Sequence, residues 1–291
     1  MTRKIYGTES DEGQSEQHKI TAYWDIKTPE PGDAKHRYRE IYDEVTKQLD
    51  SSPFGEYTIY LNYGYVATDS PQFAAHTVPI GTLNRNSVKL ILELVGDCEL
   101  TERRVLDVGC GRGGTISVLD QFFSPLSLTG VDLSHNAIAY CRRTQQDPRI
   151  EFREGDAEAL PFADESFDVV TNLESSHCYP TISNFYSEVK RVLLPGGYFL
   201  YTDVLPVDRW HSGLQTLNDL GFIVEQDRNI TANVLLSCDE VARSYVKVYS
   251  RTNDQKGLED FLSVPGSLVY DEMRASSWVY RMVRLRKPPR L

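Results

Sequence analysis

The stretch NLESSHCYP, residues 172–180, brings several reactive side chains together. Glu174, His177 and Cys178 lie in it, with two serines and a tyrosine, directly after the apolar run FDVVTNL that is typical of a buried strand. Histidine exchanges its proton near neutral pH, so His177 is the first candidate for a general base. The alternative is a histidine that caps the next helix or forms a hydrogen bond within a polar loop.

A glycine-rich turn, VLDVGCGRGG (105–114), is the second candidate site. Gly109, Gly111 and Gly114 spell GxGxxG between an apolar run and a helix-forming segment, where backbone amides and a helix N-terminus can meet a ligand. Asp132 ends the next apolar run, 18 residues after Gly114, where a dinucleotide fold has its ribose-binding carboxylate. The pattern leaves open a nicotinamide enzyme, or a tight turn that binds nothing.

Two more carboxylates favour a ligand without phosphates. Asp107 stands two residues before Gly109, where its charge would repel a pyrophosphate and attract an ammonium group. Asp156 ends a third predicted strand, RIEFREGD, where it can accept a hydrogen bond from an adenine amino group.

The elements that must position these residues alternate between strand and helix, which predicts βαβ units and a parallel sheet. Ligands of such sheets bind outside the carboxyl ends of the strands, so the glycine turn and His177 are expected at one edge. Amphipathic helices are expected over 34–50 and 84–96. Strands are expected over 103–109, 127–133, 149–156, 166–173, 198–205 and, as a closing strand, 277–287.

Length and composition restrict the protein class. The 291 residues suit one large α/β domain, and the net charge of −11 argues against a general attraction to nucleic acid or anionic membranes. Five scattered cysteines form no CxxC pattern, which indicates a reducing compartment and no structural zinc. No signal-like segment and no run of 18 apolar residues occurs, so we expect a cytoplasmic protein without a membrane span.

Four segments taken together resemble the class I S-adenosylmethionine-dependent methyltransferases. They are VLDVGCGRGG, GVDLSHNAI, GDAEALPFADESFDVV and RVLLPGGYF, in this order between about residues 100 and 205. The resemblance implies a Rossmann-like, doubly wound α/β fold with a mostly parallel seven-stranded sheet, an antiparallel closing strand and helical lid segments. It also implies S-adenosyl-L-methionine as the cofactor. The implied organisation is a mobile polar tail (1–20), a helical lid (21–85) and a core (86–291) with a lid insertion at about 206–270.

The resemblance assigns cofactor contacts residue by residue. Asp107, Gly109 and Gly111 are expected at the methionine end, and Asp132 at the ribose hydroxyls. Leu133 is expected on the adenine, with plain core packing as its alternative. Asp156 and Ala157 are expected to face the adenine, and Leu173 is also expected to contact the cofactor.

Aromatic residues before the core fit the same family. The segment YLNYGY resembles the xxGYW-like segment of many small-molecule members, with Val66 in place of the tryptophan. Tyr57, and Tyr63 or Tyr65, are therefore expected over the cofactor, where an aromatic face favours a sulfonium. A simple aromatic contact between lid and core is the alternative.

Residues 172–203 resemble mycobacterial phthiotriol and phenolphthiotriol dimycocerosate O-methyltransferases and related polyketide-tailoring enzymes, which carry E-x-S-H-C-Y-P at this place. This implies O-methylation of a hydroxyl on a polyketide-like or other secondary-metabolite small molecule, with His177 as base. Glu174 has three possible roles: orienting His177, binding the cofactor, or capping the strand. His76 and His211 are weaker candidates for the base.

Several alternatives stay open. Transfer to nitrogen or carbon would need no strong base, and a scaffold without activity is a further possibility. We expect no metal, although Asp203, Asp208 and Asp219 resemble in type the carboxylates that hold magnesium in catechol-type members. The expected partner is the small-molecule substrate; the oligomeric state is open, with a homodimer as one possibility.

Overall fold

The fold is described from a computed structural model that covers residues 31–51, 55, 58–69, 71–72, 75–248 and 263–290. The expected tail, 1–20, and Tyr57 lie outside these residues. The elements in chain order are α1 (Pro31–Asp50), α2 (Arg85–Val95), β1 (Arg104–Val108), α3 (Gly114–Phe122), β2 (Ser127–Asp132), α4 (His135–Thr144), β3 (Ile150–Glu154), β4 (Phe167–Leu173), η3 (Ser176–Cys178), α5 (Ile182–Val192), β5 (Leu193–Pro206), α6 (Val207–Asp219), β6 (Ile223–Asn229), α7 (Thr231–Val248), α9 (Leu268–Arg274) and β7 (Trp278–Arg286).

Seven strands form one sheet in the order β3-β2-β1-β4-β5-β7-β6. The pairs among the first five strands are parallel, and β7 runs antiparallel between β5 and β6. The middle strands read as short apolar runs because helices cover both faces of a parallel sheet. The predicted fold class, including the antiparallel closing strand, is therefore confirmed.

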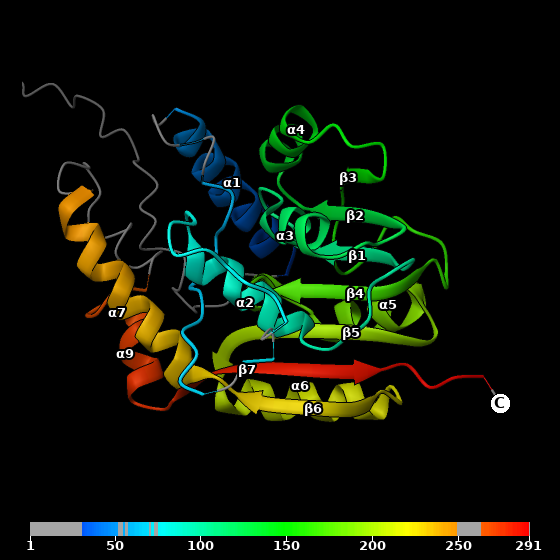
Figure 1. Ribbon diagram of the computed structural model, residues 1–291. Coiled ribbons are helices and arrows are strands. Elements are labelled where there is room, and N and C mark those ends of the chain that lie inside the picture. Colours follow the sequence, from blue (N-terminus) through cyan, green and yellow to red (C-terminus); the bar gives the residue numbers. More distant parts are fainter. Residues whose placement is uncertain are drawn as a thin grey trace, which may run out of the picture.

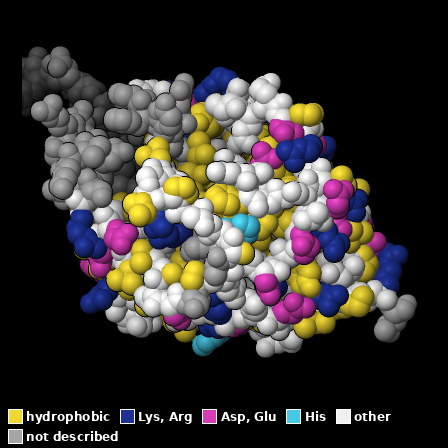
Figure 2. Space-filling view, in the orientation of Figure 1, with side chains coloured by type: hydrophobic (Ala, Val, Ile, Leu, Met, Phe, Trp, Pro, Cys, Tyr) yellow, Lys and Arg dark blue, Asp and Glu magenta, His cyan; other side chains and the backbone are white. Residues whose placement is uncertain are grey.

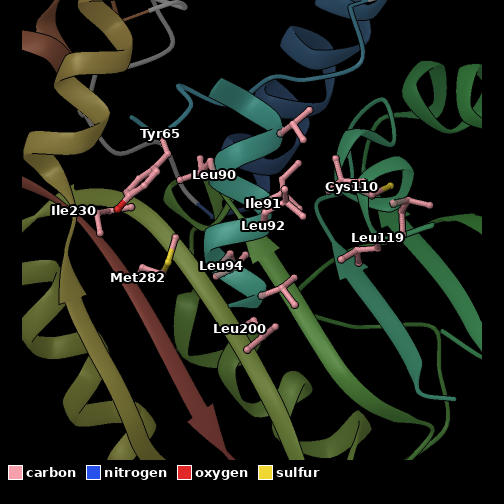
Figure 3. Close-up of a cluster of buried hydrophobic side chains, with 14 of the residues drawn as sticks. Tyr65, Leu90, Ile91, Leu92, Leu94, Cys110, Leu119, Leu200, Ile230 and Met282 are labelled. Atoms are coloured by element: carbon pink, nitrogen blue, oxygen red, sulfur yellow. The ribbon is translucent and has the colours of Figure 1, made fainter. Parts of the chain in front are cut away.

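Helices cover both faces of the sheet, as Figure 1 shows. Leu90, Ile91 and Leu94 of α2 pack toward Leu200 of β5 and Met282 of β7 in one core cluster (Figure 3). The helices α5 and α6 supply the buried side chains of the second cluster, on the opposite face. Successive residues of a strand point to opposite faces of the sheet, so one strand contributes side chains to both clusters.

The segment after β5 supplies a helix and a strand to the sheet layers. We expected a lid insertion from about 206, but α6 packs on β5 and β6 pairs with β7 through six residue pairs. Both elements therefore belong to the sheet layers. β6 forms hydrogen bonds with the edge of β7 that faces away from β5, so this edge of β7 is paired. Among the described residues of that segment, α7 and α9 are the helices outside the sheet layers, and they pack on each other and on β7.

The first helix, α1, lies along α4 at the upper edge of the sheet in Figure 1. Asp43 accepts hydrogen bonds from the Ser134 hydroxyl at 2.5 Å and from the Asn136 amide at 3.1 Å, at the start of α4. These contacts hold α1 against the loops that follow β1 and β2.

Arg112 fastens the same helix to the glycine turn from inside the protein. Its side chain is fully buried, and its guanidinium carbon lies 3.5 Å from the centre of the Tyr140 ring. The guanidinium donates to three backbone carbonyls, of Thr46, Gly55 and Thr58, and to the Asp50 carboxylate at 2.8 Å. A buried arginine is tolerated here because almost all of its donors are bonded.

Replacing Arg112 by alanine is expected to lower the free energy of unfolding by about 3 kcal/mol, because three carbonyls and Asp50 lose a charged donor. Urea unfolding measures the change. Arg143→Ala is the matched control, since Arg143 pairs with the same Asp50 from an exposed position and should cost less than about 1 kcal/mol. Equal losses in the two variants would contradict the assignment.

The face drawn in Figure 2 shows acidic and basic side chains interspersed over its described part. Among the described residues, no helix combines the length and the apolar character that crossing a bilayer requires. The expectation that no nucleic acid binds stays a prediction.

Candidate active site

A cavity that is open to solvent at its mouth lies at the carboxyl ends of β1, β2, β3 and β4. It is lined by the loops after these strands and by one face of α1. Of the residues expected at the site, those that line the cavity are Tyr63, Gly109, Gly111, Asp132, Leu133, Asp156, Ala157, Leu173, Glu174 and His177.

The glycine turn is shaped by its backbone and by Asp132. Gly109 and Gly111 have φ of +73° and +49°, and a Cβ on Gly109 would come 2.2 Å from the Ser175 hydroxyl oxygen. Asp132 accepts from the Gly111 amide through Oδ2 and from the Ser134 amide through Oδ1, both at 2.8 Å. The carboxylate therefore joins the turn to the end of β2 and lies beside the space that a ligand would use.

Asp107 does not line the cavity, contrary to the expectation that it meets the ligand directly. It is buried in β1, where its Oδ1 accepts from the Thr171 hydroxyl at 2.7 Å and its Oδ2 has no hydrogen bond among the described residues. Burial raises the pKa of Asp107 to about 7, although the Thr171 hydrogen bond opposes this shift. Asp107 precedes Gly109 by two residues in the chain. A change at Asp107 would therefore affect the cavity only by way of the glycine turn.

At the other end of the cavity, Asp156 is paired with α1. Its Oδ2 lies 2.7 Å from Lys35 Nζ, and the same nitrogen lies 2.6 Å from Glu158 Oε2. The Glu158 amide donates to Asp156 Oδ1 at 2.9 Å. An adenine amino group would therefore compete with Lys35 for Asp156, which the sequence alone did not reveal.

His177 faces a carboxylate that the sequence analysis had considered only as a possible metal ligand. Its Nδ1 lies 2.8 Å from Asp203 Oδ1, and its backbone amide donates to Asp203 Oδ2 at 3.1 Å. The Asp203 side chain is fully buried at the end of β5. It was detectable in principle, because a carboxylate inside the apolar run YFLYTDVL needs a partner.

Four donors converge on the two oxygens of Asp203. The Val204 amide and His177 Nδ1 bond to Oδ1, while the Ser176 hydroxyl, at 2.6 Å, and the His177 amide bond to Oδ2. Burial alone lowers the pKa of His177, but the neighbouring Cys178 and the Asp203 carboxylate outweigh it, and the pKa stands well above its ordinary value. The pair therefore stabilises a proton on the imidazole.

Glu174 does not orient His177. Its Oε1 accepts from the Tyr63 amide at 3.0 Å and from the Tyr280 hydroxyl instead. It is buried at the tip of β4, and burial raises its pKa to about 8, against the effect of the Tyr280 hydrogen bond. This bonding excludes the orienting role for Glu174 and leaves cofactor binding and capping of the strand open.

Aromatic side chains from α1 complete the wall of the cavity. Tyr38 and Tyr42 line it, and the Tyr42 hydroxyl lies 3.6 Å from Cys178 Sγ. Both tyrosines belong to the helix expected over 34–50, and nothing in the sequence pattern marked them as part of a site. His211 is exposed on α6, and His76 packs against Phe123 at 4.9 Å between ring centres, so neither lines the cavity.

Asp203 is bonded to His177 and is not part of a cluster with Asp208 and Asp219. Within the ranges that the structure describes, no three His, Cys, Asp or Glu side chains are grouped so that they could hold a metal ion. A reaction without metal stays a prediction.

Known proteins resemble this chain over most of its length. Residues 106–201 match the family described as "Methyltransferase domain". A fatty-acid O-methyltransferase of Mycolicibacterium smegmatis is 35% identical over 260 residues, which cover 88% of this chain and 91% of that protein. A phthiotriol/phenolphthiotriol dimycocerosates methyltransferase of Mycobacterium leprae is 35% identical over 261 residues, covering 87% and 93%.

The chain belongs to the S-adenosylmethionine-dependent methyltransferases. This membership decides against the nicotinamide enzyme that the glycine motif had left open. Solved structures agree on the fold: the cyclase SpnF has a TM-score of 0.68 at 21% identity, covering 88% of this chain and 97% of its own. Geranyl diphosphate C-methyltransferase of Streptomyces coelicolor, solved with S-adenosyl-L-homocysteine, has a TM-score of 0.60 at 18% identity, covering 84% and 98%.

The cavity of this methyltransferase fits its cofactor, S-adenosylmethionine. A Cβ on Gly111 would meet only Leu61, so the turn leaves open space where backbone amides can approach a carboxylate. We infer that Asp132 holds the ribose hydroxyls, that Leu133 and Ala157 contact the adenine, and that Gly109, Gly111 and Leu173 border the methionine part. The cofactor supplies an electrophilic methyl group on a sulfonium.

Replacing Asp132 by alanine is expected to weaken S-adenosylmethionine binding on the order of a hundredfold, because charged hydrogen bonds to the ribose and the Gly111 anchor are both lost. Calorimetric titration measures the affinity. Glu154→Ala is the control, since Glu154 ends the neighbouring strand β3, pairs with His135 and does not line the cavity. Unchanged affinity in Asp132→Ala would remove Asp132 from the cofactor site.

Proposed function

We propose that this methyltransferase transfers a methyl group to a hydroxyl oxygen of a lipid-like or polyketide-like small molecule, with His177 as general base. The observation that carries the proposal is the pair of His177 and the buried Asp203 at the wall of the cofactor cavity. A hydroxyl is a weak nucleophile toward a sulfonium, and a base that takes its proton during transfer makes it a strong one.

The bonding of His177 defines its part in the reaction. Nδ1–H donates to Asp203, so Nε2 is the nitrogen that takes the proton of the acceptor. Asp203 fixes this tautomer and stabilises the imidazolium that forms. For transfer, acceptor oxygen, methyl carbon and sulfur would have to lie in line in this cavity, with water kept from the reacting atoms.

The relatives support the substrate class. One is named for fatty acids and the others for phthiotriol and phenolphthiotriol dimycocerosates. In this chain, Tyr38, Tyr42, Ile59 and Pro180 line the cavity with largely apolar surface, which suits an apolar acceptor.

A fatty-acid carboxylate is a second candidate acceptor, and the raised pKa of His177 favours it. A carboxylate needs no base, and a protonated His177 would bind and orient it as a counterion. The two acceptors give opposite pH dependence: methylation of a hydroxyl rises with pH through the pKa of His177, whereas methyl-ester formation falls.

The test is methyl transfer from S-adenosylmethionine to long-chain alcohols, phenolic lipids and fatty acids, followed by mass spectrometry over pH 6 to 10. Ethers that form faster as the pH rises support the proposal. Methyl esters alone would establish the second candidate, and products methylated on nitrogen or carbon would overturn O-methylation.

We also infer a cytoplasmic location. All five cysteines are free and buried, which suits a reducing compartment. The homodimer stays a prediction.

A further inference from the structure

Glu174 occupies an unusual position at the end of β4. Its φ of +47° is in the left-handed region that residues other than glycine seldom adopt. Its backbone amide donates to the Thr202 carbonyl at 3.0 Å. Backbone strain of this kind persists where neighbouring contacts hold a side chain in one place. Here the strained backbone turns a carboxylate from the strand end into the cavity wall.

The two oxygens of Glu174 have different surroundings. Oε1 is fixed by the Tyr63 amide and the Tyr280 hydroxyl, from two separate parts of the chain. Oε2 has no hydrogen bond within the described ranges, and it is not among their fully enclosed, unbonded atoms. Glu174 lines the cavity and Oε2 is its oxygen without a hydrogen bond among the described residues, so we take Oε2 as the oxygen available to a ligand there. A carboxylate that is anchored on one side and open on the other is arranged to meet a ligand.

The reacting end of the cavity lies beside this carboxylate. Leu173, Glu174, Ser175 and His177 line the same wall, and the charges of Glu174 and His177 interact. If His177 takes the acceptor proton, the methyl group and its sulfur must lie close to this wall. The sulfur is the part of the cofactor whose charge changes: it is a sulfonium cation before transfer and a neutral thioether afterwards.

We propose that the Glu174 carboxylate is the counterion of the sulfonium and makes the site discriminate by charge between S-adenosylmethionine and S-adenosylhomocysteine. The proposal rests on the proposed function in one point, that His177 marks the reacting end. An anionic Glu174 strengthens binding of S-adenosylmethionine, whose sulfur is cationic. It does not strengthen binding of S-adenosylhomocysteine, whose sulfur is neutral. Methyl transfer therefore removes the attraction, and the spent cofactor leaves more readily.

Protonation of Glu174 adds a measurable signature. Burial raises its pKa to about 8, so the group is mostly neutral at pH 7 without cofactor. A bound cation favours the charged form, lowers this pKa and releases a proton. The other titratable groups that face Glu174 come from the 58–65 segment, η3, β5, α7 and β7: Tyr63, His177, Asp203, Cys238 and Tyr280.

Calorimetry without any acceptor tests the proposal. We expect the ratio of the affinities for S-adenosylmethionine and S-adenosylhomocysteine to rise about tenfold from pH 6 to pH 9, the factor that corresponds to one pKa unit of coupling. At pH 7, titrations in two buffers of different ionisation enthalpy should show proton release with S-adenosylmethionine and with the cationic analogue sinefungin, and less with S-adenosylhomocysteine.

The variant Glu174→Gln keeps an oxygen for the Tyr63 amide but has no charge. In this variant the ratio of the affinities for S-adenosylmethionine and S-adenosylhomocysteine should no longer rise with pH, and the preference for cationic ligands should fall about tenfold. The affinity for S-adenosylhomocysteine itself should change less than about twofold. His177 remains in this variant, so any proton release that disappears belongs to Glu174.

Glu158→Gln is the matched control, because Glu158 is a buried carboxylate at the opposite end of the cavity and should affect all three ligands alike. A ratio that is flat with pH in the unmodified protein, or equal ratios in the unmodified protein and Glu174→Gln, would overturn the proposal. Because no acceptor is present, these results are independent of whether His177→Ala lowers turnover.

Discussion

Replacing His177 by alanine is expected to lower turnover several hundredfold or more, within the range of about 10²–10⁴ that general bases supply. The acceptor hydroxyl would lose the imidazole that takes its proton, while the cofactor contacts of the glycine turn and Asp132 would remain. Turnover is measured with the hydroxyl acceptor that the methyl-transfer test selects, and S-adenosylhomocysteine affinity by calorimetry. Only the first quantity should change.

The control for this variant is His211→Ala, on the exposed face of α6, which should leave turnover unchanged. A small loss in His177→Ala with a hydroxyl acceptor would contradict the assignment of the base. If the accepted substrate is instead an amine, a small loss is the expected result, because a free lone pair needs no strong base.

Replacing Asp203 by asparagine is expected to lower turnover by about 10²–10⁴ as well, because the imidazole loses its fixed tautomer. The four donors at Asp203 need four acceptor positions, and an amide offers an oxygen on one side only. In either orientation the amide nitrogen faces at least one N–H donor, the His177 amide on one side or the Val204 amide and His177 Nδ1 on the other, and that donor loses its partner. We therefore also expect the free energy of unfolding to fall by about 1–3 kcal/mol.

The pH profile separates a positioning role of Asp203 from a purely structural one. In the unmodified enzyme, Asp203 helps to raise the pKa of His177, so the active neutral imidazole forms only at more alkaline pH. Without this charge the pKa falls, and the inflection of kcat/KM must move to lower pH. Asp208→Asn, on the exposed first turn of α6, is the control. A lower rate with an unmoved inflection would mean that Asp203 acts on the fold alone.

Much of the fold follows from local patterns. The apolar runs that became β1, β2 and β4 are bounded by glycine or polar residues, and right-handed crossovers between parallel strands leave few ways to arrange them. The cofactor turn was also predictable, because positive φ at Gly109 and Gly111 requires glycine, and Asp132 ends the next strand. These features depend on residues that are close in the sequence.

The partners of the reactive residues were not predictable in this way. The sequence placed Glu174 three residues from His177 and suggested that they act together, but each bonds to a different element. Asp203 comes from β5, and Tyr280 comes from β7, a strand that is distant from β5 in the chain and pairs with it in the sheet. Lys35 likewise reaches Asp156 from α1 across 121 positions of the chain.

The sequence by itself determined the strands of the parallel sheet and the glycine turn, because each is encoded within one short segment whose backbone preference and hydrophobic period can be read directly, and it made His177 the candidate base. The tertiary structure decided which carboxylate serves His177, which tyrosine anchors Glu174, and that Asp107 lies behind the turn and not in the cavity. These are contacts between strands that are neighbours in the sheet but distant in the chain, and no local preference specifies them.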